Sequence, residues 1–327
     1  MTSPGVDVIV PCYDYGRYLR QCTQSVLQET GLPIRVLIID DASNDGSAEV
    51  ARAIAAEDHR VEVIVHPENR GHVATFNEGI AWVRSPYMLL LSADDMVAPH
   101  ALARAVAVME ARPEVAFVYG RPVRFAHDDD LATGGGDGDD IPATFCAGQT
   151  FIRRICTRPD NPVETATAVV RTSVQHRVGG YRPQLPHTGD LEMWLRCAAE
   201  GDVGFIPQVQ AFTRIHGGNM RLAYSGERVI ADYQQRLQAF ELFFAAYAHQ
   251  VRDAQDLLRL ARRALAEQAL WAAAHRFEEA KTPAAGQLAR LAWTMDRSIP
   301  STTLWWKILV KRTLGPRLWR VLAKAAA

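Results

Sequence analysis

The chain has 327 residues, of which 48% are hydrophobic and 22% are charged, values ordinary for a globular protein with a sizeable core. Its formal net charge of -1 provides no global field that would attract nucleic acid, so we expect no nucleic-acid partner. The 5 cysteines include no Cys-x-x-Cys pair, which argues against a disulfide framework and against a structural zinc site.

The amino-terminal half alternates strand and helix patterns. Its strand-like runs are Val6 to Val10, Arg35 to Ile39, Val61 to Val65, Tyr87 to Leu91 and Val115 to Tyr119. These runs start about 25 to 30 residues apart, the length of one βα unit. Apolar residues between them recur at helical spacing. This order predicts an α/β fold with a mostly parallel sheet and helices on both faces.

Paired carboxylates follow two of these strands. Asp40 and Asp41 end the second run, and Asp94 and Asp95 follow the fourth. Open α/β sheets place their ligands at the carboxyl ends of strands. A carboxylate after the second run could accept from a base N–H or a ribose hydroxyl. Asp94 and Asp95 repel each other, and each favours a hard divalent cation. The alternative for the second pair is a helix-capping Asp beside a solvated one. Pro99 is expected to start the next helix at its first position.

Glycine-based nucleotide sites are absent from the sequence. The first βα turn has only Gly16, and neither Gly-x-Gly-x-x-Gly nor a Gly-x-x-x-x-Gly-Lys-Ser/Thr loop occurs. A nucleotide bound to this chain is therefore expected to be held through a metal and carboxylates.

The carboxy-terminal third has a different pattern. Residues from about 226 to 280 carry apolar and aromatic side chains at helical spacing, which indicates core packing. Residues 301 to 327 combine three tryptophans with six basic residues and no acid. Such a segment either contacts an anionic membrane peripherally or docks as a terminal helix on the protein's own core.

No secretory leader and no membrane-length apolar run is evident in the sequence. A reducing compartment fits the cysteine usage. We therefore expect a cytoplasmic protein, at the inner face of the membrane if residues 301 to 327 bind there.

Several motifs occur together in a fixed order. They are Val8-Ile9-Val10-Pro11-Cys12-Tyr13-Asp14, Ile38-Ile39-Asp40-Asp41-Ala42-Ser43, Asn69-Arg70-Gly71, Asn77-Glu78-Gly79, Leu91-Ser92-Ala93-Asp94-Asp95, Gly179-Gly180-Tyr181, Asp190-Leu191-Glu192-Met193-Trp194, and Arg214-Ile215-His216-Gly217-Gly218-Asn219. By these motifs, about residues 5 to 225 resemble the family 2 glycosyltransferases of the GT-A fold. The resemblance implies a Rossmann-like GT-A domain over 1–225, with a nucleotide-sugar-binding half (1–120) and an acceptor and catalytic half (121–225). Residues 226–327 would form a helical extension.

The resemblance also implies roles at the donor site. Tyr13 and Asp41 would hold the base of a nucleotide-sugar, Pro11 would line the same pocket, and Asp94 would lie at the ribose side. Asp95 would ligate Mn²⁺ or Mg²⁺ that bridges the diphosphate. The alternative for Tyr13 is an ordinary loop aromatic.

On the acceptor side, the resemblance implies that Asp190 is the general base and that His216 adds a metal or diphosphate contact. The alternative for His216 is a loop histidine that touches neither. The implied reaction moves a sugar, with a UDP-sugar as the favoured donor, to a glycan, lipid-linked or other hydroxyl acceptor with inversion.

Two residues depart from the family pattern. Ser92 stands where an acid often precedes Asp94, and Gly189 stands where an acid often precedes the base. These departures motivate a second hypothesis, a non-catalytic nucleotide-sugar binder or scaffold on the same fold. A nucleotidyltransferase is a third, but it would need a basic loop after the first strand, and residues 11 to 16 contain no Lys or Arg.

Overall fold

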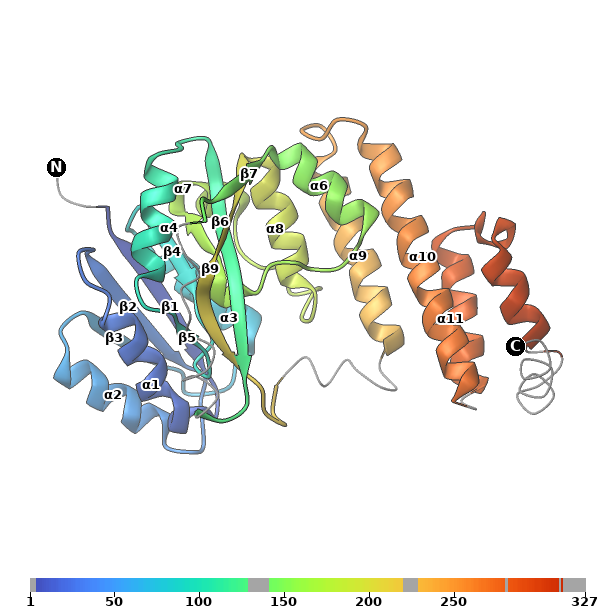
Figure 1. The fold of residues 1–327 in the computed structure, drawn as a ribbon. Helices are drawn as coiled ribbons and strands as arrows, with labels where there is room; N and C mark the ends of the chain where they lie inside the picture. The colour runs from blue at the N-terminus through green and yellow to red at the C-terminus, as the bar shows by residue number, and fades with distance from the viewer. Residues whose placement is uncertain (1–3, 129–140, 220–228, 280–281, 312, 314–327) are drawn as a thin grey trace. The chain divides into compact units, whose positions relative to one another are not determined.

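The computed structural model describes residues 4–128, 141–219, 229–279, 282–311 and 313 (Figure 1). The chain divides into two compact units. The first unit is Met1–Phe151 with Asn161–Asn219, and the second unit is Ile152–Asp160 with Met220–Ala327. Nothing in the sequence predicts that residues 152–160 belong to the second unit. The functional division into a donor half, an acceptor half and a helical extension stays a prediction.

A mixed, mostly parallel sheet of nine strands forms the centre of the first unit, counted over the described residues. The strands are β1 (Val6–Cys12), β2 (Ile34–Asp40), β3 (Val61–Val65), β4 (Tyr87–Leu90), β5 (Met96–Val97), β6 (Val115–Phe125), β7 (Thr144–Cys146), β8 (Val169–Arg171) and β9 (Asp202–Arg214). Their order is β3-β2-β1-β4-β8-β6-β9-β5, with β7 also on β9. The first four strands run parallel, as the βα repeats predict.

The second half of the sheet departs from the sequence-based expectation. Strand β8 runs antiparallel to both β4 and β6, and β9 extends over 13 residues. The expectation for Pro99 is wrong: a two-residue strand, β5, intervenes, and the next helix begins at Ala101 with His100 as its N-cap.

Helices flank the sheet in Figure 1. Those lying wholly in the first unit are α1 (Gly16–Leu27), α2 (Ser47–Glu57), α3 (His72–Trp82), α4 (Ala101–Glu110), α7 (Thr172–Val178) and α8 (Gly189–Ala199), with the short η2 (Thr165–Thr167). Helix α6 (Gly148–Thr157) crosses from the first unit into the second.

Strand β1 is buried on both faces, as a central parallel strand requires. Val8 and Val10 join one core cluster with α1, α2 and α4. Ile9, on the opposite face, meets α3, where a Cβ at Gly79 would lie 2.3 Å from Ile9 Cγ2. Glycine therefore lets the α3 backbone approach the strand closely.

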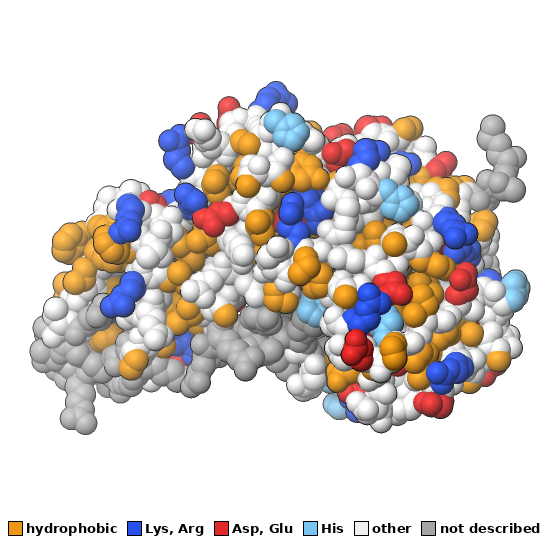
Figure 2. All heavy atoms as spheres, turned by 180° about the vertical axis from the view of Figure 1, so that it is seen from behind, with side chains coloured by type: hydrophobic (Ala, Val, Ile, Leu, Met, Phe, Trp, Pro, Cys, Tyr) orange, Lys and Arg blue, Asp and Glu red, His pale blue; other side chains and the backbone are white. Residues whose placement is uncertain are grey.

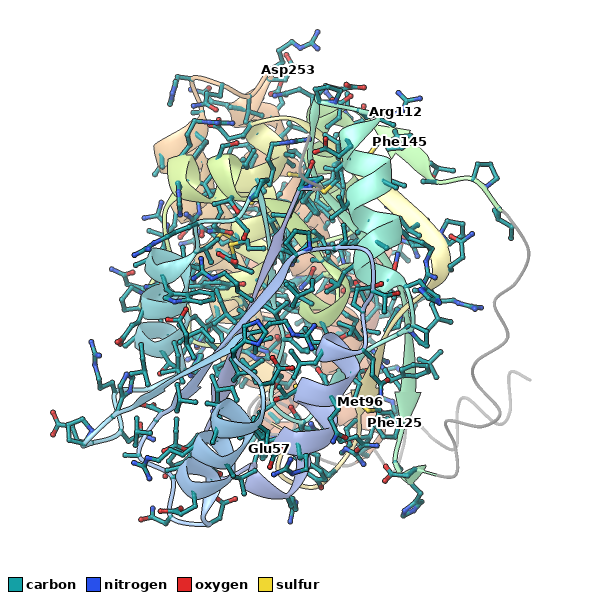
Figure 3. All side chains as sticks on the ribbon, turned by 90° about the vertical axis from the view of Figure 1, so that its left-hand side faces the viewer. Glu57, Met96, Arg112, Phe125, Phe145 and Asp253 are labelled. Carbon is teal, nitrogen blue, oxygen red and sulfur yellow. The ribbon has the colours of Figure 1, made fainter. Side chains whose placement is uncertain are left out.

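The carboxyl ends of the parallel strands gather the site residues. Strand β9 lies there between β5 and β6. Met96 of β5 pairs with Phe212, and Phe125 of β6 pairs with Arg214. Figure 3 labels Met96 and Phe125 near each other. At another place in this unit, the Arg112 guanidinium lies 4.2 Å over the Phe145 ring (Figure 3).

The second unit is helical in its described part. It contains α9 (Val229–Tyr247), α10 (Ala254–Glu278), α11 (Thr282–Met295), the short η5 (Ile299–Ser301) and a helix over 303–311. Arg236 and Gln268 both bond to Asp160, which ties 152–160 to α9 and α10. Within the described residues, no helix is long and apolar enough to cross a membrane. Of the basic segment predicted at 301–327, residues 312 and 314–327 lie outside the described part.

Candidate functional site

The loops after β1 and β2 are joined to each other. The Asp14 N–H donates to Ser43 Oγ at 2.9 Å, and the Asn44 N–H donates to Asp14 Oδ1 at 2.8 Å. Asp14 and Ala42 both adopt the left-handed region, with φ of 57° and 59°. Such strain in non-glycine residues concentrates at functional sites. Tyr13 stands on this junction with 46% of its surface exposed, so its ring is open to a ligand.

Asp41 is an anchor for the loop after β3. Its Oδ1 accepts from His66 Nδ1 at 2.7 Å and from the Arg70 N–H at 2.8 Å, while Oδ2 accepts from the Gly71 N–H at 2.9 Å. Burial opposes its ionisation, but the hydrogen bonds from His66, Arg70 and Gly71 outweigh it and lower the pKa of Asp41. Both oxygens of this predicted base-binding residue are therefore engaged within the protein.

Asp40 differs from its neighbour. It ends β2 and is buried, and its Oδ2 accepts from the Ser43 N–H at 3.2 Å. Its Oδ1 is buried without a hydrogen-bond partner among the described residues. A buried carboxylate oxygen without a donor is costly, so it marks a place where a ligand N–H or hydroxyl would be stabilised. The half-buried Pro11 precedes Cys12, whose pKa of about 11 reflects burial first and, among smaller causes, the charge of Asp40.

Asp94 is held by three side chains. Its Oδ1 accepts from Ser92 Oγ at 2.6 Å, and its Oδ2 accepts from His216 Nε2 at 2.9 Å and from Asn219 Nδ2 at 3.3 Å. The Gly218 N–H donates to His216 Nδ1 at 3.1 Å. That bond assigns the proton to Nε2, so both ring nitrogens are engaged in this arrangement. The serine at the departure from the family pattern thus orients Asp94.

Asp95 is connected to the end of β9. Its Oδ1 accepts from the Arg214 N–H at 2.9 Å, and its other oxygen makes no hydrogen bond with a described residue. Burial first, and then the charge of Asp94, raise the pKa of Asp95 well above its ordinary value. An ionised Asp95 is therefore destabilised unless a cation joins it.

The donor set at Asp95 is sparse. No three or more His, Cys, Asp or Glu side chains in the described residues are grouped to hold a metal ion. The available Asp95 oxygen fits a Mn²⁺ or Mg²⁺ ion that takes its other ligands from a diphosphate and water, because these hard ions prefer oxygen and Mg²⁺ commonly keeps few protein ligands.

Arg214 holds this part of the site together. Its Nε donates to the Asp94 carbonyl at 3.3 Å, and its terminal nitrogens donate to Asp128 at 2.9 Å and to Gln21 at 2.6 Å. Its guanidinium also lies 4.5 Å from the centre of the Tyr18 ring. A planar fork of donors suits such multiple bonding. Arg214 therefore connects β9, α1 and the Asp94-Asp95 turn.

Asp190 lies in the first turn of α8. Thr165 Oγ1 donates to its Oδ2 at 3.4 Å. Burial is the largest cause of its raised pKa, and Glu164 adds to the rise. Glu164 also raises the pKa of Asp95, so one carboxylate is within electrostatic reach of both residues.

Helix α3 braces the chain that leads to Asp190. Asn77 Nδ2 donates to the Tyr181 carbonyl at 2.9 Å, and the Tyr181 N–H donates to Asn77 Oδ1 at 2.6 Å. A Cβ on Gly180 would lie 2.3 Å from Asn77 Oδ1, which explains the glycine. Two motifs of the sequence, Asn77-Glu78-Gly79 and Gly179-Gly180-Tyr181, thus contact each other in the fold.

Sequence reasoning did not distinguish Asp40 from Asp41, and it assigned no role to Glu164 or Arg214. Asp40 had a signal, since it stands beside Asp41 at a strand end. Glu164 had none, because its proximity to Asp95 and Asp190 arises only from folding.

The open, mostly parallel sheet carries carboxylates at its strand ends, the place where open α/β sheets bind their ligands. The sequence model for glycosyl transferase family 2 matches residues 7–173. This chain therefore belongs to glycosyl transferase family 2.

Two curated relatives match parts of the chain. Glycosyltransferase GlyG of Streptococcus pneumoniae serotype 4 is 37% identical over 93 residues, which are 28% of this chain and 31% of GlyG. Putative glycosyltransferase EpsH of Bacillus subtilis is 34% identical over 99 residues, which are 30% of this chain and 28% of EpsH. The match thus spans less than a third of the length of either relative.

Two solved structures share the fold over nearly the whole chain. S. aureus TarS 1-349 in complex with UDP-GlcNAc gives a TM-score of 0.57 at 12% identity, covering 91% of this chain and 92% of that one. The mannosyltransferase PcManGT from Pyrobaculum calidifontis, in complex with GDP-Man and Mn²⁺, gives 0.52 at 18% identity, covering 96% and 87%. Identities this low show a common fold alone.

Proposed function

We propose that this protein transfers a sugar from a nucleotide-diphosphate sugar, with a UDP-sugar as the favoured donor, to a hydroxyl of a glycan, a lipid-linked sugar or a similar acceptor. The observation that carries the proposal is Asp190. It lies at the start of α8 with a pKa raised by burial, and Glu164 is within electrostatic reach of both it and Asp95. A carboxylate with a raised pKa is a better proton acceptor at neutral pH.

For the donor we propose Tyr13 against the base and Pro11 in the pocket wall. The unpaired Oδ1 makes Asp40 a better candidate than Asp41 for a polar contact with the nucleoside. Asp94, oriented by Ser92 and His216, would lie at the ribose side. A direct metal contact by His216 would require it to leave Asp94, so in this arrangement we assign it to positioning.

In the proposed reaction, Asp190 accepts the proton of the acceptor hydroxyl. The acceptor oxygen forms a bond to the anomeric carbon as the bond from that carbon to the diphosphate oxygen breaks, with inversion. The electron pair leaves with the nucleoside diphosphate. When bound at Asp95, Mn²⁺ or Mg²⁺ would stabilise the charge on the departing diphosphate as a Lewis acid.

The test uses the full chain and a panel of UDP- and GDP-sugars with and without Mn²⁺. A donor should raise the melting temperature by mass action, and the same donor should be consumed in a transfer or hydrolysis assay. Binding without turnover on any acceptor would support the non-catalytic binder instead. An unchanged melting temperature across the whole panel would contradict both the transferase and the non-catalytic binder.

A further inference from the structure

The helix over 303–311 in the second unit has apolar residues on two faces. Its inner face includes Ile308, which is buried, and Lys311, which pairs with Glu278 at 2.7 Å. Its outer face carries Trp306, Leu309 and Val310, which are 59%, 37% and 47% exposed. These three lie at i, i+3 and i+4, one stripe of a helix. The outer stripe therefore stays exposed in the described part of this unit.

Helix α11 and the residues that follow it add a tryptophan and cations in the same unit. Trp293 is 42% exposed, and the Arg297 guanidinium lies 3.9 Å over its ring. A groove of about 580 Å³ is lined by Trp293, Arg290 and Trp305, among others. Trp305, which lines the groove, is the chain neighbour of Trp306. In Figure 2, hydrophobic side chains gather at the left with Lys and Arg beside them.

The basic residues beside these tryptophans are unpaired within the described part of the chain. Arg290, Arg297 and Lys307 are exposed, and no described acidic residue forms an ion pair with them. The sequence of this part of the chain is also basic. From residue 297 to the end, the basic residues are Arg297, Lys307, Lys311, Arg312, Arg317, Arg320 and Lys324, with no Asp or Glu.

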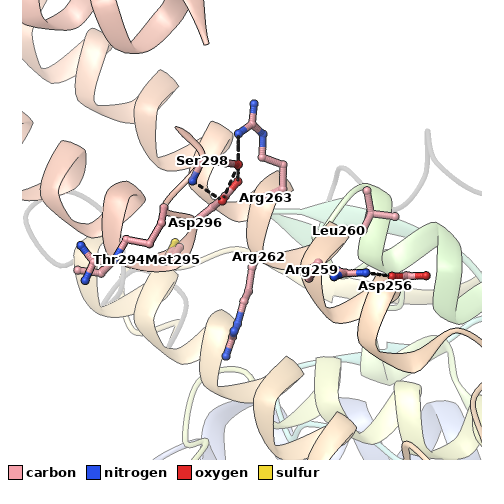
Figure 4. Close-up of a pocket in the computed structure, with 10 residues that line it drawn as sticks. Asp256, Arg259, Leu260, Arg262, Arg263, Thr294, Met295, Asp296 and Ser298 are labelled. Carbon is pink, nitrogen blue, oxygen red and sulfur yellow. Dashed lines mark hydrogen bonds and ion pairs between the residues drawn. The ribbon is translucent and has the colours of Figure 1, made fainter. Parts of the chain in front are cut away.

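A second groove, of about 620 Å³ between α10 and α11, also contains arginines but differs in charge. Arg263 pairs there with Asp296 at 3.0 Å, and Arg259 pairs with Asp256 (Figure 4). Arg262 pairs with Glu241 at 2.7 Å. Three cations of this groove are thus neutralised within the protein, whereas Arg297, which also lines it, forms no ion pair with a described residue.

We propose that the surface formed by Trp293, Trp306, Leu309 and Val310 with Arg290, Arg297 and Lys307, here called the tryptophan face, binds the surface of an anionic phospholipid bilayer. Tryptophan rings prefer the headgroup region, and each basic residue near an anionic surface contributes about 1 kcal/mol. The protein's own residues 314–327 carry only positive charges, and a second tryptophan face is also positive. The positive charge of the tryptophan face would repel each of these two candidates, whereas it would attract lipid phosphates.

The test is flotation of the full chain with vesicles of phosphatidylcholine alone or with roughly a third phosphatidylglycerol, at low and high salt. The wild-type protein should float with the anionic vesicles at low salt and much less at high salt. The double variant Trp306→Ser, Leu309→Ser should bind about tenfold more weakly or worse, because two apolar anchors are lost. Circular dichroism and the melting temperature check that it folds.

Trp271→Ser is the matched control. Trp271 is 66% exposed on α10 and lies one helical turn after Glu267, outside the tryptophan face. It should leave flotation unchanged. Equal binding to both vesicle types, binding to neither, or wild-type flotation by the double variant would overturn the proposal. So would a dimer seen by light scattering for the wild type and not for the double variant, which would assign the face to a second copy.

Discussion

Asp40 and Asp41 are adjacent in sequence but have different surroundings. Three donors converge on Asp41, whereas one oxygen of Asp40 is buried without a partner. The pKa of Asp41 is lowered, so its contribution to stability is present above the ordinary carboxyl pKa and is lost as pH falls through the lowered one.

We therefore expect Asp41→Asn to lower the free energy of unfolding by about 1–3 kcal/mol at neutral pH, because its amide group would face the Gly71 N–H. The difference should disappear in acid. Asp40→Asn keeps the acceptor for Ser43, so it should melt near the wild-type temperature while binding nucleotide about tenfold more weakly. Melting curves and nucleotide titrations of both variants check this pair. The reverse pattern would return the donor role to Asp41.

Asp190 differs from Asp41 in this respect: ionisation of Asp190 is expected to lower the stability of the fold, whereas ionisation of Asp41 raises it. Burial raises its pKa, so its ionised form costs folding free energy. That cost is absent below the ordinary carboxyl pKa, where the group is protonated in both states, and it is fully present above the raised value.

We expect Asp190→Asn to melt at or above the wild-type temperature at neutral pH, with the gain vanishing in acid. Transfer should fall about 10²- to 10⁴-fold because the general base is lost, while donor binding remains. Turnover assays, donor titrations and melting curves at several pH values measure all three effects. Near-wild-type turnover would remove Asp190 from the mechanism.

At the scale of elements, α3 supports two parts of the site. It packs on β1 through Gly79, and Asn77 on the same helix holds the Gly180-Tyr181 segment before α8. The packing of one helix therefore influences the donor loops and the chain that leads to the base.

Gly79→Ala should destabilise the protein by about 1–3 kcal/mol through overpacking against Ile9, despite the better helix propensity of alanine. Gly217→Ala is the matched control, because a Cβ there meets nothing within 4 Å. Chemical denaturation of the two variants gives the comparison. Equal stability would mean that α3 shifts away from β1 at no cost.

At the scale of the whole molecule, the two compact units are expected to respond to different ligands. UDP or GDP with Mn²⁺ should slow hydrogen exchange in the loops after β1, β2 and β4 of the first unit, and leave α10 and α11 unchanged. Mass spectrometry of exchanged peptides measures this. Protection confined to the second unit would place the nucleotide site elsewhere.

Local signals were sufficient for much of the fold. Buried apolar runs at βα spacing predicted β1, β2, β3, β4 and β6, because each signal lies within a few neighbouring residues. They did not predict β5, the length of β9 or the antiparallel β8, since these depend on partners distant in the chain.

The sequence by itself determined the family, the parallel half of the sheet and the carboxylates at its strand ends. Only the tertiary structure showed that Asp41 is saturated, that Asp40 retains an unpaired oxygen, and that Glu164 lies within reach of both Asp95 and Asp190. The physical reason is that a strand pattern is local, whereas the hydrogen bonding and electrostatic surroundings of a carboxylate are set by residues that folding brings to it from elsewhere in the chain.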